Sequence, residues 1–210
     1  AISRTDKKVF IVKNDGLGNF TLTQTITYGT DPRAIITGDW DGDGDIDIAI
    51  TNSSPSTITI LKNLNNGNFS QTNSFVFLED INSFTSGDFD NDGKLDIAIG
   101  ISGGLKIMKN DGGANFTIIL VLSSTLVQSA KSSNDLDEDG DLDLISGAII
   151  INNGNNTFAI STIPNFVGTF IQTGDFDNDG DIDIVSYGSS QPGSFSILKN
   201  KNYSTVSGNV

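Results

Sequence analysis

The sequence has no cysteine and no histidine among its 210 residues. The lack of cysteine excludes disulfides, zinc–thiolate sites and thiol nucleophiles, and the lack of histidine excludes imidazole acid–base catalysis. No apolar run is long enough to cross a bilayer as a helix, so we expect no direct membrane insertion. We identify no catalytic residues and expect that the chain is not an enzyme.

The residues that are abundant favour strands and turns. Isoleucine, leucine, valine and phenylalanine are plentiful, alanine is sparse, and 23 glycines accompany many asparagines, serines and threonines. This mixture suits β-strands joined by tight turns and disfavours helices. The composition therefore predicts an all-β fold.

The negative charge is concentrated in four short loops. Most of the 26 acidic residues lie in residues 39–47, 88–96, 135–143 and 175–183, which we call loops 1 to 4. Carboxylates packed this closely repel one another by about 3 kcal/mol per close pair at an effective dielectric constant near 20. A bound divalent cation is the simplest compensation. The net charge of -14 also argues against a nucleic-acid partner.

One sequence template occurs four times. The copies are GDWDGDGDIDI at 38–48, GDFDNDGKLDI at 87–97, NDLDEDGDLDL at 134–144 and GDFDNDGDIDI at 174–184. Successive copies are 49, 47 and 40 residues apart. This period is typical of β-propeller blades made of four antiparallel strands.

A second feature recurs out of phase with the loops, an apolar strand that ends in a Lys-Asn or Asn-Asn turn. It occurs five times, and one repeat reads strand, strand, acidic loop, strand, strand. The predicted segments are the last strand of a preceding blade at 1–18, four blades at 19–65, 66–112, 113–154 and 155–200, and the start of a further blade or a tail at 201–210. We expect part of a longer propeller. The alternative is a small closed ring whose N-terminal strand covers an edge or pairs with a neighbouring molecule, so that edge strands could self-associate.

The spacing of the acidic residues indicates calcium. Carboxylates fall at positions 1, 3, 5 and 9 of each loop, with glycine at position 6, and Ca²⁺ prefers six to eight oxygen ligands. The predicted side-chain ligands are Asp39, Asp41, Asp43 and Asp47 in loop 1; Asp88, Asp90, Asp92 and Asp96 in loop 2; Asp135, Asp137, Asp139 and Asp143 in loop 3; and Asp175, Asp177, Asp179 and Asp183 in loop 4. The predicted backbone carbonyl ligands at position 7 belong to Asp45, Lys94, Asp141 and Asp181. The sequence therefore predicts about four Ca²⁺ ions.

Two other acidic loops share the opening of this template. EF-hands and dockerin-like repeats place an acidic residue at position 12 and lead into helices. Here position 12 is Ile50, Ile99, Ser146 or Ser186, and β-branched residues follow the loops. Four solvated acidic turns without metal are the remaining alternative, and the fourfold repetition at matched positions argues against it.

These residues resemble the FG-GAP or VCBS type of repeat, which is found in integrin α-subunit propellers and in many bacterial and archaeal surface proteins. The resemblance implies a β-propeller with a calcium loop in each blade. Loop 3 departs from the pattern, with Asn134 before the loop, Leu136 at position 2 and Glu138 at position 4. The position-2 residues Trp40, Phe89, Leu136 and Phe176 are expected to pack between blades.

The predicted function is a calcium-stabilised scaffold for adhesion that binds a protein or a glycan. Because millimolar calcium is found outside cells, we expect an extracellular or cell-surface location. One alternative is a purely structural module of a surface layer or filament. A second is a non-catalytic part of a polysaccharide-degrading enzyme.

Overall fold

The computed structural model describes residues 2–3, 7–27, 31–65, 67–124, 127, 129–155, 157–162, 170–187, 194–200 and 205–209. The predicted all-β class is confirmed, because these residues form strands and turns and no helix. Accordingly, none of them belongs to a helix that could cross a membrane.

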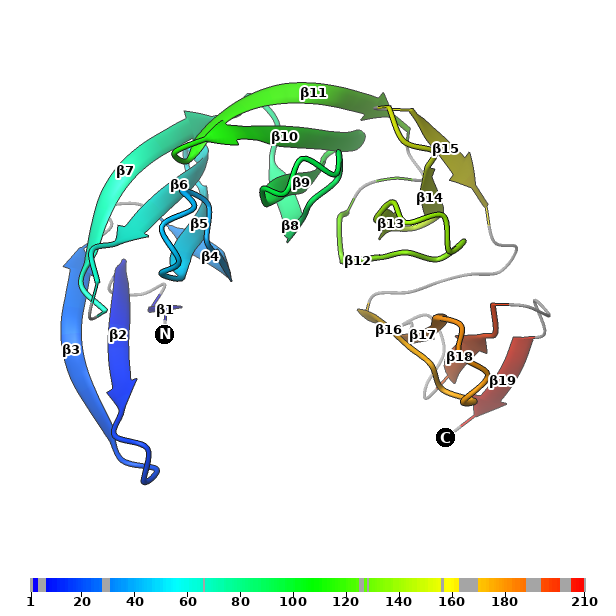
Figure 1. The fold of residues 1–210 in the computed structure, drawn as a ribbon, viewed down its shortest axis with the longest axis horizontal. Helices are drawn as coiled ribbons and strands as arrows, with labels where there is room; N and C mark the ends of the chain where they lie inside the picture. Colours follow the sequence, from blue (N-terminus) through cyan, green and yellow to red (C-terminus); the bar gives the residue numbers. More distant parts are fainter. Residues whose placement is uncertain are drawn as a thin grey trace. The chain divides into compact units, whose positions relative to one another are not determined.

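The strands form five separate antiparallel sheets (Figure 1). The first sheet has the order β1-β2-β3, with β1 (Ile2–Ser3), β2 (Lys8–Asn14) and β3 (Phe20–Thr27). The second has β4 (Pro32–Gly38), β5 (Asp47–Ser53), β6 (Ser56–Asn63) and β7 (Phe69–Val76). The third has β8 (Ile81–Gly87), β9 (Asp96–Ile101), β10 (Gly104–Gly112) and β11 (Asn115–Ser123).

The last two sheets repeat the same arrangement with shorter strands. The fourth has β12 (Ser132–Asn134), β13 (Asp143–Ile145), β14 (Ile149–Asn152) and β15 (Phe158–Ser161). The fifth has β16 (Phe170–Gly174), β17 (Asp183–Tyr187), β18 (Ser194–Leu198) and β19 (Thr205–Asn209). In every sheet each strand pairs with the strand that follows it in the chain. This pattern is consistent with a β-propeller-like fold.

The chain divides into two compact units. Unit 1 comprises residues 1–81 and 110–117, and unit 2 comprises residues 82–109 and 118–210. The apolar core of unit 1 lies between its first and second sheets, where Val9 of β2 packs with Ile48, Ile50 and Leu61. Each unit thus buries apolar side chains between successive sheets.

Unit 2 has two such cores. One joins β9 and β10 to β13 and β14 and includes Ala98, Ile107, Leu144 and Ile150. The other joins the fourth and fifth sheets through Ile145, Ile184 and Leu198. Every residue of β9, the second strand of the third sheet, is buried.

The sheets group the strands differently from the predicted blade segments. The sequence analysis assigned residues 19–65 to one blade, whereas β3 pairs with β2 over seven residue pairs from Lys8↔Thr27 to Asn14↔Phe20. Asp15 closes this hairpin, since its Oδ1 accepts a hydrogen bond from the Leu17 amide at 2.8 Å. Strands joined by a tight turn stay paired. Each four-stranded sheet therefore begins with the strand before an acidic loop, and that loop joins its first and second strands.

Candidate metal centres

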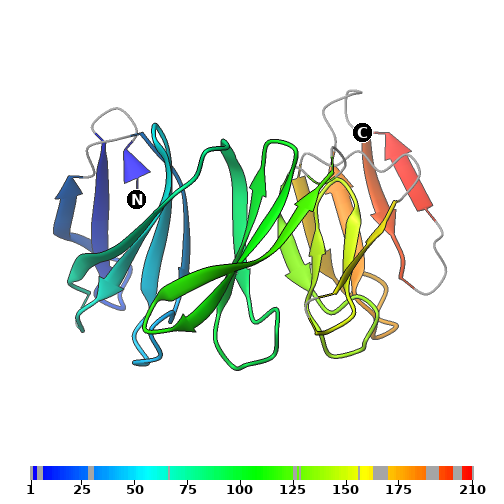
Figure 2. The same ribbon diagram turned by 90° about the horizontal axis from the view of Figure 1, so that it is seen from above.

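Each acidic loop is the hairpin connection between the first two strands of a sheet. Loop 1 joins β4 to β5, loop 2 joins β8 to β9, loop 3 joins β12 to β13, and loop 4 joins β16 to β17. The strand pairing begins at equivalent places, at Gly38↔Asp47, Asn134↔Asp143 and Gly174↔Asp183. Within unit 2, loops 2 to 4 project from the same end of their sheets, where the first strand connects to the second, as the green, yellow-green and orange turns of Figure 2 show.

The backbone of every loop turns through two left-handed residues. Position 6 is glycine in all four, with φ of 88° at Gly44, 84° at Gly93, 93° at Gly140 and 98° at Gly180. Position 4 is also left-handed, with φ of 78° at Gly42, 56° at Asn91, 65° at Glu138 and 61° at Asn178. Glycine and asparagine tolerate this conformation, whereas glutamate is strained in it. The predicted role of the position-6 glycine in a sharp turn agrees with this geometry.

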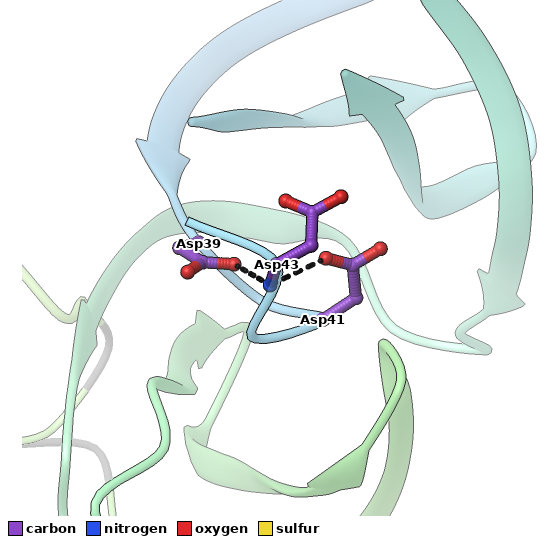
Figure 3. Close-up of side chains that lie close together, drawn as sticks. All are labelled: Asp39, Asp41 and Asp43. Atoms are coloured by element: carbon purple, nitrogen blue, oxygen red, sulfur yellow. Dashed lines mark hydrogen bonds between the residues drawn. The ribbon is translucent and has the colours of Figure 1, made fainter. Parts of the chain in front are cut away.

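The aspartate at position 1 holds the turn closed. Its Oδ2 accepts a hydrogen bond from the position-6 glycine amide in every loop: 2.9 Å at Asp39, 2.8 Å at Asp88, 3.0 Å at Asp135 and 3.1 Å at Asp175. In loop 1 the Asp43 amide also donates to Oδ1 of Asp39 and of Asp41, at 3.2 and 3.3 Å (Figure 3). These amides fix the carboxylates of positions 1 and 3 close to each other.

The aspartate at position 9 anchors the loop to its sheet. Asp47, Asp96, Asp143 and Asp183 are all buried. Their Oδ2 atoms accept hydrogen bonds from the position-2 amides of Trp40, Phe89, Leu136 and Phe176, at 2.8 to 3.2 Å. In loops 1, 3 and 4, Oδ1 also accepts from the amides of Asn63, Asn152 and Asn200 at the end of the third strand.

At least three carboxylates converge in each loop. The groups are Asp39, Asp41 and Asp43; Asp88, Asp90 and Asp96; Asp135, Asp137 and Asp143; and Asp175, Asp177 and Asp183, each with one oxygen per residue within 4.8 Å of the others. Positions 1 and 3 therefore meet in all four loops. Position 9 joins them in loops 2, 3 and 4, and position 5 joins them in loop 1.

The remaining predicted side-chain ligands lie outside these groups. They are Asp47, Asp92, Asp139 and Asp179. The position-5 carboxylates accept a hydrogen bond from the position-7 amide in every loop, at 2.9 to 3.0 Å. The proposed carbonyl ligands of Asp45, Lys94, Asp141 and Asp181 stay a prediction. At position 7, the Lys94 ammonium turns back to Oδ2 of Asp92 at 2.8 Å.

The four groups offer what a hard divalent cation requires. Every donor is a carboxylate oxygen, the ligand type that Ca²⁺ and Mg²⁺ prefer. Two of these oxygens, Oδ1 of Asp90 and Oδ1 of Asp135, are buried without a hydrogen-bond partner. Burying a carboxylate oxygen without a partner is costly, and a bound cation would remove that cost. The residues therefore fit a metal ion.

Comparison with known proteins identifies the family. The family model described as FG-GAP-like repeat matches residues 1–50, 39–99 and 88–146. The chain belongs to the FG-GAP-like repeat family. A search of the curated proteins found no match. The predicted resemblance to this type of repeat is therefore confirmed.

A solved structure shares the fold. A lectin of Agrocybe aegerita, whose structure is described as the basis of specific recognition of non-reducing terminal N-acetylglucosamine, matches with a TM-score of 0.66 and 19% identity. The match covers 96% of this chain and 60% of the lectin chain. The FG-GAP-like chain thus spans about three fifths of the length of that relative.

Lysines lie against three of the four FG-GAP-like loops. Lys62 contacts Asp41 and lies 2.9 Å from Asp43, and Lys109 contacts Asp90 and lies 2.7 Å from Asp92. Lys199 lies 2.6 Å from Asp177. The sequence analysis did not assign these lysines to the site, although the recurring Lys-Asn strand ends contained the signal.

The lysines and burial shift the loop pKa values in opposite directions. Hydrogen bonds from Lys109 and Lys94 lower the pKa of Asp92 to about 2, and the hydrogen bond from Lys199 lowers the pKa of Asp177. Burial raises the pKa of Asp143 to about 6. Loss of solvation, followed by repulsion from Asp139, raises the pKa of Asp137. Burial likewise raises the pKa of Asp47 in loop 1.

Asparagine side chains from the following sheet contact loops 1, 2 and 3. Asn110 Nδ2 donates to the Trp40 carbonyl at 2.8 Å within unit 1. In unit 2, Asn152 Nδ2 donates to the Phe89 carbonyl at 2.9 Å, and Asn200 Nδ2 donates to the Leu136 carbonyl at 2.6 Å. The accepting position-2 residues are buried.

Phe176 differs from the other position-2 residues. Its side chain is 48% exposed, whereas Trp40 and Phe89 are each 1% exposed. Burial of Trp40, Phe89 and Leu136 agrees with the predicted packing role, whereas the exposure of Phe176 fits it only partly. The position-2 side chain is therefore buried in loops 1 to 3 of this FG-GAP-like chain and about half exposed in loop 4.

Proposed function

We propose that each of the four acidic loops binds one calcium ion and that the chain is a calcium-stabilised β-propeller, or part of one, at the cell surface or outside the cell. The convergence of three carboxylates in every loop supports this proposal most directly. The propeller itself is supported by the FG-GAP-like family and by the four-stranded antiparallel sheets.

Different positions would contribute differently to such a site. The carboxylates at positions 1 and 3 would hold the ion in every loop, joined by position 9 in loops 2 to 4 and by position 5 in loop 1. The bound ion would supply positive charge that offsets repulsion among the carboxylates. The chain's own residues close the turn and attach it to the sheet, so the ion would rigidify the loop and take part in no reaction.

A binding role fits this rigid scaffold better than catalysis. The scaffold would present its other loops to a protein or a glycan in adhesion. The similar lectin recognises non-reducing terminal N-acetylglucosamine, which makes glycan binding the specific candidate. An exposed aromatic pair supports it: Phe170 and Tyr187 are cross-strand partners in β16 and β17 and are 69% and 46% exposed. Aromatic rings of this kind suit the apolar faces of sugars.

Thermal unfolding tests the calcium proposal. At a calcium concentration 100 times Kd, each site would add about 2.7 kcal/mol to the free energy of unfolding. We expect addition of EDTA to lower the melting temperature and calcium in excess to restore it. An unchanged melting temperature in excess chelator would refute structural calcium.

A single substitution tests the assignment to the loops. Asp137→Asn keeps the shape of a carboxylate in the loop 3 group but weakens one ligand, so isothermal titration should detect about three ions where the parent chain binds about four. Asp111→Asn removes an exposed aspartate outside the loops and should leave the number unchanged. Equal loss of calcium in both variants would argue against the loops.

Glycan binding has its own test. A glycan array probed with the calcium-loaded chain should give signal for terminal amino sugars, and Phe170→Ala should reduce it. Binding to no glycan, combined with regular self-association in calcium, would favour the structural module of a surface layer or filament. Tyr28 and Tyr203, the other candidate sugar-stacking tyrosines, lie outside the described residues.

A further inference from the structure

Three of the four acidic loops contain a positive charge supplied by the chain itself. The ammonium groups of Lys62, Lys109 and Lys199 contact the position-3 carboxylates Asp41, Asp90 and Asp177. Position 3 belongs to the converging carboxylate group in every loop. The lysines therefore contact the same carboxylate groups that would bind a metal ion.

The fourth member of this set is an isoleucine. Lys62, Lys109 and Lys199 each directly precede the asparagine that ends the Lys-Asn turn, and in the fourth sheet Ile151 stands in that place before Asn152. An isoleucine side chain brings no charge to loop 3. Loop 3 also has a buried carboxylate oxygen that lacks a hydrogen-bond partner, Oδ1 of Asp135.

An ammonium and a divalent cation cannot share these carboxylates without cost. Calcium requires six to eight oxygens at about 2.3–2.6 Å, so carboxylate oxygens that bind an ammonium must be released or shared. If the ammonium stays, its charge repels the ion. The side chains of Asp41 and Asp90 are only 9% and 13% exposed, so solvent screens these ion pairs less than surface pairs.

We propose that Lys62, Lys109 and Lys199 are built-in counter-ions that compete with the divalent cation, and that loop 3, which has Ile151 instead, is the high-affinity site. This inference rests on the proposed function, because it assumes that the loops bind calcium. The four sites fill in order. Loop 3 fills at low calcium, and loops 1, 2 and 4 fill at higher calcium as the ion displaces each ammonium.

The same arrangement means that carboxylate repulsion is offset differently in the four loops when calcium is scarce. In loops 1, 2 and 4 the ammonium offsets part of the carboxylate repulsion, so these turns keep a compensating charge without metal. Loop 3 has no such lysine contact in the part of the chain that the structure describes, so it depends more on the ion. Calcium at low concentration therefore acts first on the fourth sheet.

Isothermal titration of calcium into the metal-free chain tests the order of filling. We expect one tight site and three sites that are about tenfold weaker, the scale of one to two partly buried ion pairs. Ile151→Lys should remove the tight class. Lys13→Met is the matched control, because Lys13 holds the same place before Asn14 in β2 but its sheet has no acidic loop among the described residues.

The single tryptophan of the chain allows one loop to be followed alone. Trp40 lies between Asp39 and Asp41, so terbium luminescence excited through tryptophan reports loop 1. Lys62→Met keeps the aliphatic stem of the side chain and should raise the terbium affinity of loop 1 about tenfold. Ile151→Lys should leave that affinity unchanged. The melting temperature of each variant in excess calcium shows that it is folded.

The outcomes separate this inference from the proposed function. Four equivalent sites, or an unchanged loop 1 affinity in Lys62→Met, would overturn the competition by lysine while leaving calcium binding intact. A chain that binds neither calcium nor terbium would overturn the proposed function itself. One tight site that Ile151→Lys weakens supports the inference.

Discussion

At the scale of single residues, position 4 of the acidic loops shows a side chain that is poorly suited to its backbone conformation. The position is left-handed in all four loops, and three of them carry glycine or asparagine there. Loop 3 carries Glu138 with φ of 65°. A left-handed L-residue costs about 1–2 kcal/mol, and asparagine relieves part of that cost. Glu138 therefore lowers the stability of the loop.

Replacing Glu138 with asparagine should stabilise the chain. We expect Glu138→Asn to raise the free energy of unfolding by about 0.5–1 kcal/mol, because asparagine adopts the left-handed region more easily. Denaturant unfolding in EDTA measures the change. Glu138→Gln removes the same charge without relieving the backbone, so it should give a smaller gain. An equal gain in both variants would assign the effect to charge.

At the scale of strands and sheets, the asparagine that ends the third strand of the fourth sheet, Asn152, performs two tasks. In the fourth sheet the Asn152 amide donates to Asp143 at 2.8 Å, and its side chain donates to the carbonyl of Phe89 at 2.9 Å. The first contact holds loop 3 to its own sheet, and the second holds loop 2 from a neighbouring one. Asn152 is fully buried. A repeat can therefore be attached to the next through one side chain.

Removal of that side chain should be costly. Asn152→Ala leaves the buried Phe89 carbonyl without its donor, and an unsatisfied buried group costs about 1–3 kcal/mol. We expect the free energy of unfolding to fall by that amount in thermal or denaturant unfolding. Asn153 is exposed one residue further on, and Asn153→Ala should change stability by less than about 0.5 kcal/mol. Similar losses in the two variants would contradict the role of Asn152.

At the scale of the whole chain, the net charge of -14 is the dominant electrostatic feature. Much of this negative charge lies in the four loops. Lysines offset part of the carboxylate charge in loops 1, 2 and 4. Salt screens repulsion between exposed charges over a Debye length of about 8 Å at physiological ionic strength. Metal-free and calcium-loaded chains should therefore respond to salt differently.

The expected difference is measurable by melting. In EDTA, raising sodium chloride from low to molar concentration should increase the melting temperature, because it screens the carboxylates that calcium would otherwise neutralise. In excess calcium the same salt series should have a smaller effect. Potassium chloride serves as a control for a specific effect of sodium. A salt response of equal size with and without calcium would show that loop repulsion does not limit stability.

Much of the candidate site could be predicted from the spacing of aspartates. Positions 1 and 3 converge in every loop, as the sequence indicated, and the glycine at position 6 is left-handed. Positions 5 and 9 differ between loops, because Asp47 lies outside the loop 1 group while Asp43 lies within it, and their assignment as ligands stays a prediction. Spacing places side chains on one side of a turn but does not decide which oxygens the backbone amides already occupy.

The blade segments show the same limit at a larger scale. The sequence located five hairpin strands and four loops, but residues 20–27 pair with β2 and not with the strands that follow. Strand existence depends on local composition, whereas sheet membership depends on which neighbour supplies hydrogen bonds. A repeated sequence can be divided in more than one phase until that pairing is known.

The sequence by itself determined the all-β class, the repeat family and the four clusters of carboxylates, because each follows from residue types at fixed local spacing. Only the tertiary structure showed that Lys62, Lys109 and Lys199 contact these clusters and that Ile151 takes the equivalent place beside loop 3. Those lysines lie about 20 residues from the aspartates they contact. Such contacts form when β-strands pair, and pairing is set by the sheet as a whole.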